Sequence, residues 1–293
     1  MKPTKLLVLG LVVALCAGFT LCGCSSSDYS PEKKEQTISS SALKEDGVLK
    51  VGVDSSSAPY AVSSSGSLIG LEVDIAAALA DEMGLELELV DVGSDVAKGI
   101  TTENVDIVVG ATTKNDAYAL SDSYLSTAVC LFSTDATAKA PADTSGDYKI
   151  AAQASSMSAF DVTEHYGETH LVSVSNLADA FTKLSDGSAQ FAASDSIIGS
   201  YAAHSAKISA YPIAILGDKT YRCVAVASNN TELLKEINNA IASLSKGGMI
   251  KVIEKKWLGT SVDITGLEQV TVTAAEPEET TEEEKEKSST SGN

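Results

Sequence analysis

From residue 48 to residue 258, short runs rich in β-branched residues alternate with longer stretches whose apolar residues recur at helical spacing. Residues 49–53 have the composition of a strand, and residues 73–83 form a helical pattern that stops at Gly84. The same alternation resumes at Lys149. Strands that alternate with helices build mainly parallel sheets covered by helices. The sequence therefore predicts an α/β protein made of two such units.

The individual elements follow from the same periodicities. We expect strands at residues 49–53, 85–90, 105–109, 129–133, 149–152, 171–174, 189–193 and 221–227. We expect helices at residues 73–83, 95–103, 157–166, 176–185, 231–245 and 249–257. Ser94 is placed to cap the helix 95–103. The passage 136–146 is rich in Pro, Ala, Thr and Gly, and it predicts a crossing between the two units.

The N-terminus has the pattern of an export signal. Two lysines precede an apolar run at residues 6–19, which is shorter than the roughly 20 residues that a spanning helix needs. The run ends in Leu21-Cys22-Gly23-Cys24, which resembles the lipobox of bacterial lipoproteins. This resemblance implies that residues 1–23 are removed and that acylated Cys24 anchors the protein on the extracytoplasmic face of the cell membrane. The alternative is an ordinary secretory peptide with a chance cysteine.

Both ends of the exported chain are poor in apolar residues. Residues 24–42 are mainly Ser, Lys and Glu, which cannot bury enough surface to offset the entropy of ordering, so we expect a flexible tether. Residues 268–293 include a run of glutamates, which is typical of a solvated, disordered tail. We therefore expect the function to lie between about residues 43 and 266.

The composition excludes several classes of function. The formal net charge is -19, and Arg222 is the one arginine in the chain. Nucleic-acid binding requires clustered lysines and arginines, so we expect no nucleic-acid partner. No phosphate-binding GxxxxGKS/T loop and no HExxH zinc motif occurs, and His165, His170 and His204 show no metal-ligand spacing. We therefore expect neither a metal nor a cofactor.

Two cysteines follow Cys24 in the chain, Cys130 and Cys223. In an oxidising compartment such a pair can form a disulfide. The alternative is that each is a small buried apolar residue, because free cysteine is among the most buried residue types. The residues alone leave both alternatives open.

Several motifs occur together in a defined order. They are Leu49-Lys-Val-Gly-Val-Asp54, Ala58-Pro-Tyr60, Gly70-Leu-Glu-Val-Asp74, Val105-Asp-Ile-Val-Val-Gly110, Ser121-Asp-Ser-Tyr124, Asn230-Thr-Glu-Leu-Leu-Lys-Glu-Ile-Asn238 and Gly247-Gly-Met-Ile-Lys-Val-Ile-Glu-Lys-Lys-Trp-Leu-Gly259. Each motif is weak alone. Their order and spacing resemble those of family 3 extracellular solute-binding proteins, the polar amino-acid receptors of ABC importers. The resemblance covers nearly all of residues 48–259.

The resemblance implies a periplasmic-binding-protein-like fold of type II, in which two lobes joined by two crossover hinge strands trap a ligand between them. Lobe 1 would comprise residues 43–134 and 220–262, and lobe 2 residues 135–219. The crossover strands would contain Cys130 and Cys223. Cysteines on neighbouring strands can come within disulfide range, so the bridge stays a hypothesis.

The resemblance also implies where a ligand carboxylate binds. The family uses an arginine and backbone amides of lobe 1, and the corresponding loop here contains Gly110, Thr112 and Lys114. Lys114 stands nearest to the position of the family's arginine. A lysine cannot reproduce the bidentate contact of an arginine, and a solvent-facing loop lysine is the alternative. From lobe 2 the N-terminus of a helix contributes, and Ser156 and Met157 match that position.

Three further residues match ligand contacts of the family. Asp195 corresponds to the aspartate that binds the ligand ammonium, and it follows a predicted strand, where α/β proteins bind ligands; its alternative role is a cap or turn. Tyr60 corresponds to an aromatic wall, with a core tyrosine as the alternative. Asp54 ends the first strand and would suit a cationic or polar side chain, with a turn residue as the alternative.

These features predict a substrate-binding lipoprotein of an ABC importer that captures an amino acid or similar small polar solute by hinge closure. Its partners would be the ligand, a permease in the membrane and, through the lipid, the membrane itself. We expect a monomer. Two alternatives stay open. One is a dehydratase-type enzyme on the same fold, for which Asp54, Glu72 and Asp195 are the available acid–base groups, and the other is a ligand-sensing or adhesion module without a transporter.

Overall fold

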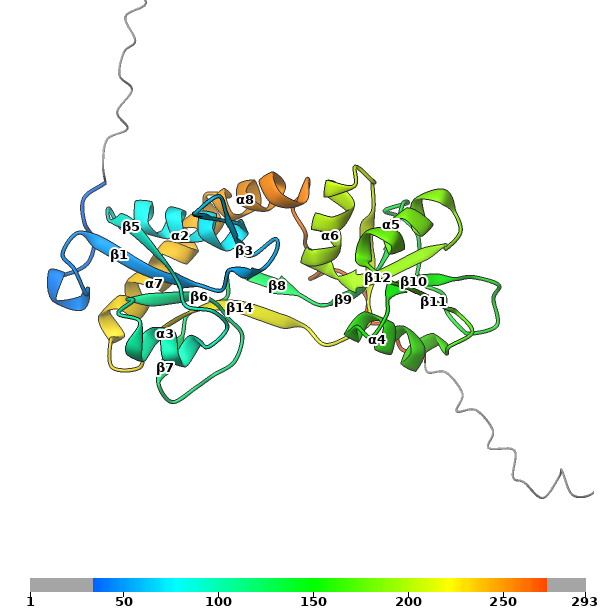
Figure 1. Ribbon diagram of the computed structural model, residues 1–293, viewed down its shortest axis with the longest axis horizontal. Coiled ribbons are helices and arrows are strands. Elements are labelled where there is room, and N and C mark those ends of the chain that lie inside the picture. Colours follow the sequence, from blue (N-terminus) through cyan, green and yellow to red (C-terminus); the bar gives the residue numbers. More distant parts are fainter. Residues whose placement is uncertain (1–33, 273–293) are drawn as a thin grey trace, which may run out of the picture. The chain divides into compact units, whose positions relative to one another are not determined.

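The computed structural model describes residues 34–272, which form two α/β lobes (Figure 1). The expected signal peptide, Cys24 and residues 273–293 of the expected tail lie outside the described residues. Within residues 34–272, no helix combines the length and the apolar character needed to cross a membrane. The α/β fold class predicted from the sequence is confirmed.

The first lobe is built on a mixed sheet. Across the sheet the strands are β5 (Glu86–Asp91), β1 (Val48–Val53), β6 (Ile107–Ala111), β14 (Thr220–Ala227) and β7 (Tyr118–Leu120), and β8 (Leu125–Thr127) also pairs with β14. β1 runs parallel to β5 and β6, whereas β14 runs antiparallel to its neighbours. The helices of this lobe are α2 (Leu71–Glu82), α3 (Val96–Thr102), α7 (Thr231–Lys246) and α8 (Met249–Leu258). α2 and α8 lie on one face of the sheet and α3 on the other (Figure 1).

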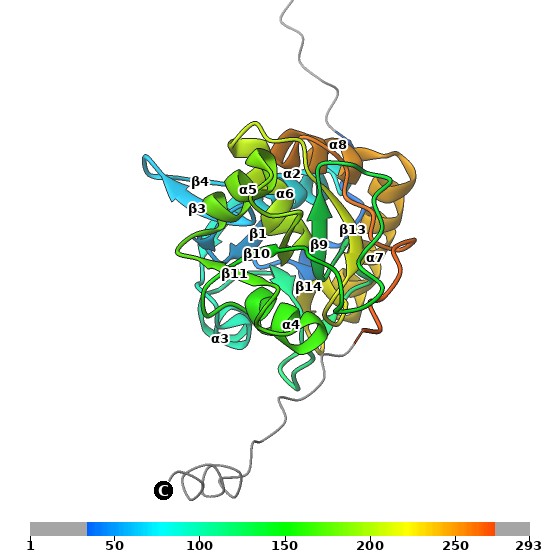
Figure 2. The same cartoon turned by 90° about the vertical axis from the view of Figure 1, so that its right-hand side faces the viewer.

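The second lobe repeats this architecture. Its strands are, in order across the sheet, β11 (Leu171–Val174), β10 (Ile150–Gln153), β12 (Phe191–Asp195), β9 (Val129–Ser133) and β13 (Tyr211–Ile215). Its helices are α4 (Met157–Tyr166), α5 (Leu177–Asp186) and α6 (Ser196–Ser205). Figure 2 shows α5 and α6 on one face of the sheet and α4 on the other. β10 runs parallel to β11 and β12, so these strands end at the same edge of the sheet.

The chain crosses between the two sheets after Thr127, which ends β8, and returns through residues 216–219 into β14. β9 pairs with β12 and β13, and it therefore belongs to the second sheet. Residues up to 134 were instead predicted to belong to the first lobe. The passage 136–146, predicted to be a crossing, connects β9 to β10 within the second lobe. Strand pairing decides where the lobes divide, and pairing cannot be read from local composition.

The N-terminal part of the described chain is packed on the first lobe. The backbone N–H of Thr37 donates a 3.1 Å hydrogen bond to the carbonyl of Met83. Ile38 is buried, and η1, a short 3-10 helix, spans Ser40–Ala42. The flexible tether predicted for residues 24–42 is therefore wrong for residues 34–42. Ile38 and hydrogen bonds to the first lobe hold this stretch, and its polar composition gave no sign of this packing.

The C-terminal part of the described chain returns to the second lobe. The Ile215 N–H donates to the Glu268 carbonyl at 2.9 Å, and the Val270 N–H donates to the Ile215 carbonyl at 2.8 Å. Residues 267–272 thus lie beside the end of β13 in the second lobe. Because they follow α8 of the first lobe in the sequence, the chain passes from the first lobe to the second a further time. The disordered tail predicted for residues 268–293 is wrong for residues 268–272.

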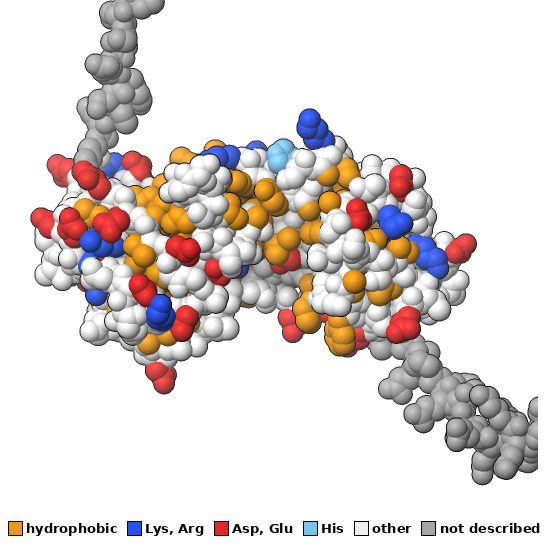
Figure 3. Space-filling view, in the orientation of Figure 1, with side chains coloured by type: hydrophobic (Ala, Val, Ile, Leu, Met, Phe, Trp, Pro, Cys, Tyr) orange, Lys and Arg blue, Asp and Glu red, His pale blue; other side chains and the backbone are white. Residues whose placement is uncertain are grey.

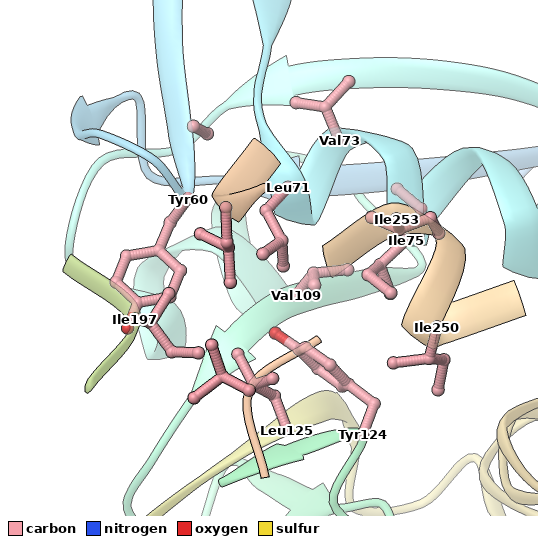
Figure 4. Close-up of a cluster of buried hydrophobic side chains, with 14 of the residues drawn as sticks. Tyr60, Leu71, Val73, Ile75, Val109, Tyr124, Leu125, Ile197, Ile250 and Ile253 are labelled. Carbon is pink, nitrogen blue, oxygen red and sulfur yellow. The ribbon is translucent and has the colours of Figure 1, made fainter. Parts of the chain in front are cut away.

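A continuous apolar cluster runs through both lobes. In the first lobe it includes Leu71 at the start of α2 and Tyr60 (Figure 4). Ile197 of α6, in the second lobe, belongs to the same cluster. Deeper in the second lobe, Phe132 of β9 and Phe181 of α5 meet edge to face, with their ring centroids 5.2 Å apart. Each sheet is thereby fixed against its helices, and an apolar seam joins the two lobes.

Most predicted elements lie within a few residues of the observed ones. The helix at 157–166 and the strand at 171–174 coincide with α4 and β11. The short strands were not predicted: β7, β8, β13 and the hairpin strands β2 (Ser56–Ser57), β3 (Ala61–Ser64) and β4 (Ser67–Ile69). The predicted cap of the second helix is also wrong, because Asp95, and not Ser94, accepts the hydrogen bond of the Lys98 N–H at 2.9 Å.

Candidate functional site

A polar cavity of about 390 Å³ lies where the two lobes meet, a size typical of small-molecule pockets. The first lobe and its connections provide Asp54, Ser57, Tyr60, Gly110, Thr112, Thr127, Thr220 and Arg222. The second lobe provides Asp195 and Ile198. We call this cavity the cleft. Five residues predicted from the sequence to contact a ligand are therefore brought together here: Asp54, Tyr60, Gly110, Thr112 and Asp195.

Tyr60 forms a wall of the cleft and is itself nearly buried. Its backbone is fixed by the start of α2, because the Glu72 N–H donates to the Tyr60 carbonyl at 2.9 Å. Gly70 makes this approach possible: a Cβ there would lie 2.1 Å from the Tyr60 carbonyl oxygen. Burial, reinforced by the carboxylate of Asp195, raises the pKa of Tyr60 far above its usual range. The side chain is therefore a neutral aromatic surface.

Arg222 lies on the ring of Tyr60, with the guanidinium carbon 3.7 Å from the ring centroid. Its Nε donates to Oε1 of Glu72 at 2.6 Å, and the hydroxyl of Tyr124 donates to the same oxygen at 2.6 Å. Glu72 is only 1 % exposed. Burial works against the charge of Arg222, but Glu72 outweighs it, so the pKa of Arg222 is raised and the guanidinium stays charged.

Arg222 was not predicted from the sequence to be a site residue. As the one arginine of the chain it indicated only that nucleic-acid binding is excluded. The available signal for a site residue was its position on β14, the strand that follows a crossing between the lobes. The partner Glu72 is 150 positions away in the sequence, so no local pattern could have joined the two.

Gly110 closes the space around the Arg222–Glu72 pair. It is the penultimate residue of strand β6 and has a left-handed conformation, with φ of +96°. A Cβ at this position would lie 2.6 Å from Oε2 of Glu72 and 2.8 Å from Nη2 of Arg222. Glycine is therefore required here both by the backbone conformation and by the space that the ion pair occupies.

Asp195 ends β12 and caps α6. Its Oδ1 accepts hydrogen bonds from the N–H groups of Ile197 at 2.9 Å and Ile198 at 3.0 Å. Its Oδ2 accepts a 2.6 Å hydrogen bond from the hydroxyl of Thr127, at the end of β8. The cap interpretation of Asp195 is thus confirmed, and the carboxylate also lines the cleft, whereas its role in binding a ligand ammonium stays a prediction.

Asp54 also lines the cleft and shapes a local turn. Its carboxylate accepts a 3.1 Å hydrogen bond from the Ser56 N–H. The residue is half-buried directly after β1. A turn and a cleft-facing carboxylate are therefore compatible at this position.

Lys114 lies apart from these residues. It lines a separate cavity next to β7, together with Asn115 and Asp116, and its side chain is exposed. It is absent from the lining of the cleft. This placement agrees with the solvent-facing alternative given for Lys114, and the cationic group in the cleft is Arg222.

Ser156 and Met157 begin α4 and are likewise absent from the cleft lining. The Ser156 hydroxyl caps the helix by accepting the Ala159 N–H at 3.1 Å. Met157 and Phe160 are 67 % and 60 % exposed, and Figure 3 shows apolar side chains on the surface over α4. The ligand roles of Ser156 and Met157 stay predictions.

The two cysteines of the described chain are free and buried, so the bridge considered from the sequence is not formed. Cys130 pairs within the second sheet opposite Ser194 and Ile215, and Cys223 pairs within the first sheet opposite Ala111. Burial raises the pKa of Cys130 to about 12. This thiol is therefore an unreactive part of the core.

Two of the three acid–base groups considered for an enzyme are already engaged. Glu72 is held by Arg222 and Tyr124, and Asp195 caps α6 while it accepts from Thr127. Among residues 34–272, no cluster of three His, Cys, Asp or Glu side chains could hold a metal ion. The site offers charges and hydrogen bonds for holding a small polar molecule.

Two α/β lobes with a polar cleft between them define a solute-binding protein of the two-lobed type. The chain belongs to the bacterial extracellular solute-binding proteins, family 3, whose family model matches residues 49–260. It is similar to the L-cystine-binding protein TcyA of Bacillus subtilis (strain 168), with 24 % identity over 266 residues that cover 88 % of this chain and 98 % of the relative.

Solved structures show the same fold. A polar amino acid ABC uptake transporter substrate-binding protein from Streptococcus thermophilus matches with a TM-score of 0.66 and 20 % identity, over 76 % of this chain and 90 % of that one. The L-cystine solute receptor of Neisseria gonorrhoeae, solved in the unliganded open conformation, matches with a TM-score of 0.61 and 21 % identity, over 74 % of this chain and 94 % of that one.

Proposed function

We propose that this protein is the substrate-binding component of an ABC importer and that it captures an amino acid or a similar small polar solute outside the cytoplasm. The observation that carries the proposal is the cleft, to which the first lobe contributes Tyr60 and Arg222 and the second lobe Asp195. A free amino acid presents a carboxylate and an ammonium, and burying either without a partner is costly. The cleft offers a side chain of opposite charge for each.

Capture would proceed by closure of the lobes on the ligand. Contacts from both lobes are complete only when the lobes approach each other, so the ligand shifts the equilibrium toward the closed form by its differential affinity. The closed form would then dock on a permease. One relative is named an L-cystine-binding protein, and another is named a substrate-binding protein of a polar amino-acid transporter. Both names support an amino acid as the ligand.

The protein would be held at the cell membrane through acylated Cys24 and would act as a monomer. Support for the anchor is the sequence Leu21-Cys22-Gly23-Cys24 at the end of an apolar run. A dehydratase activity receives no comparable support, because Glu72 is occupied by its two partners.

A thermal-shift screen tests the proposal. The chain starting at Ser25 would be heated with each of the common amino acids, L-cystine, short peptides and simple amines. A ligand at 100 times its dissociation constant stabilises the folded state by about 2.7 kcal/mol, which is easily measured. Stabilisation by one or a few amino acids, confirmed by calorimetry, is the expected result. Failure of every amino acid and of L-cystine to stabilise the protein would contradict the proposal.

A further inference from the structure

Arg222 is placed and held as an anion-binding group. It lines the cleft from β14, and its side chain is 18 % exposed, so the guanidinium is largely withdrawn from water without being sealed off. It is also the one arginine of the chain. Charge-assisted hydrogen bonds are strongest where the dielectric is low, so a guanidinium in this position binds a carboxylate more strongly than an exposed lysine would.

The guanidinium is preorganised by two contacts. The ring of Tyr60 lies against its face, and Glu72 holds Nε at 2.6 Å. The space beside Nη2 is left open because residue 110 is a glycine, whose added Cβ would lie 2.8 Å from Nη2. Glu72 is fixed in turn by the hydroxyl of Tyr124 at 2.6 Å. An arginine carries five N–H donors in a rigid plane, so fixing the Nε side also orients the remaining donors. Little side-chain entropy is then lost when a ligand carboxylate binds.

The remaining charges of the cleft select against an anionic ligand. Glu72 balances Arg222, and Asp54 and Asp195 add two more carboxylates to the lining. The cleft thus carries two more negative than positive charges. A ligand with a carboxylate and a single ammonium is neutral and leaves this excess unchanged, whereas a second positive charge on the ligand reduces it and a second negative charge increases it.

We propose that Arg222 is the residue that binds the ligand carboxylate, and that Asp54 and Asp195 make the cleft selective for an amino acid with a cationic side chain. This inference rests on the proposed function. Asp195 would hold the α-ammonium and Asp54 the side-chain cation. Arg222 lies on a strand that leads out of a crossing between the lobes, so the carboxylate would be held at the hinge side of the cleft.

A pair of matched ligands separates a direct contact from a structural ion pair. Lysine and cadaverine differ only in the carboxylate. Calorimetry on the chain starting at Ser25 should show lysine binding about 10- to 100-fold more tightly than cadaverine, which is the range expected for losing charge-assisted hydrogen bonds. In Arg222→Met, which keeps the contact with Tyr60 but removes the charge, this difference should nearly vanish.

Two further variants keep the test informative if Arg222→Met is unstable. Arg222→Lys retains the charge and should keep a reduced preference for lysine over cadaverine. Glu72→Gln loosens the guanidinium and should weaken lysine binding while the preference over cadaverine persists. An unchanged preference in the Arg222 variants would overturn the assignment of the carboxylate contact.

A second comparison tests the charge selectivity. The wild-type chain should bind lysine or arginine more tightly than glutamine, and glutamine more tightly than glutamate. Asp54→Asn should reduce the gap between lysine and glutamine. Equal or tighter binding of glutamine would overturn the selectivity while it supports the proposed amino-acid function. Absence of binding by every amino acid would overturn both.

Discussion

The hydroxyl of Thr127 donates a 2.6 Å hydrogen bond to the carboxylate of Asp195, which joins the end of β8 in the first lobe to the end of β12 in the second. The same carboxylate caps α6 and lines the cleft. Asp195 is therefore connected at once to the crossing between the lobes, to a helix and to the space that a ligand would occupy. Removing the charge of Asp195 should therefore affect its hydrogen bond at the crossing, the cap of α6 and the binding of a ligand.

Asp195 variants should separate binding from capping. Asp195→Asn can still accept the N–H of Ile197, so it should keep most of the stability but weaken amino-acid binding by about 10- to 100-fold, because a charged hydrogen bond is lost. Asp195→Ala should lose in addition about 1 kcal/mol of unfolding free energy with the cap. Calorimetry and urea unfolding measure the two effects, and unchanged affinity in both variants would remove Asp195 from the site.

Gly110→Ala should disturb the Arg222–Glu72 pair. A left-handed conformation costs a non-glycine residue about 1–3 kcal/mol wherever it occurs. Gly66→Ala is the matched control, because Gly66 has φ of +81° and nothing within 4 Å of the added Cβ. Gly110→Ala should therefore be less stable than Gly66→Ala and should also bind the ligand more weakly. Equal stability and unchanged binding in the two variants would show that the pair does not need this space.

The C-terminal segment should contribute measurably to stability. A chain ending at Gly266 loses two backbone hydrogen bonds to Ile215 and the buried side chain of Val270 that a chain ending at Val272 retains. At about 1 kcal/mol for each bond and about 1.5 kcal/mol for the valine, the loss should be about 3.5 kcal/mol. Chemical unfolding of the two chains measures it, and identical midpoints would contradict the packing of this segment.

The two buried thiols should stay reduced and unreactive in the folded protein. The chain starting at Ser25 should have the same intact mass with and without reductant, because Cys130 and Cys223 both carry free thiols. A thiol reagent should modify both cysteines in denaturant and modify them very slowly under native conditions, because both are buried and burial raises the pKa of each. A mass lower by two hydrogens without reductant would restore the disulfide.

Glu254 should make stability depend on pH in a defined direction. It is buried, accepts a 2.6 Å hydrogen bond from the Ser261 hydroxyl, and burial raises its pKa. When the pKa of an acid is higher in the folded state than in the unfolded state, the protonated acid contributes to the stability of the folded state. This contribution is complete at pH values below the unfolded-state pKa and is lost as the pH rises through the folded-state pKa. Relative to Glu254→Gln, the wild-type protein should therefore gain stability as pH falls from 7 toward 4.5. Urea unfolding at both pH values measures the difference, and a pH-independent difference would contradict the shift.

Sequence periodicity predicted those elements that are amphipathic and regular. The helix at 157–166 and the strand at 171–174 have the predicted bounds. α6 was missed because Ile197, Gly199 and Ala203 are all buried, so the helix has no continuous polar face to produce a helical period. The short strands β7 and β8 depend on pairing with β14 and have too few residues to show an alternation of their own.

By itself, the sequence determined that the chain alternates strands and helices, carries strong negative charge and contains the ordered motifs of a solute-binding protein, because these are properties of local composition and spacing. Only the tertiary structure decided that Arg222, and not Lys114, supplies the positive charge of the cleft. The reason is that a buried charge needs a partner, and the partner of Arg222 is Glu72, which reaches it only through the pairing of strands far apart in the chain.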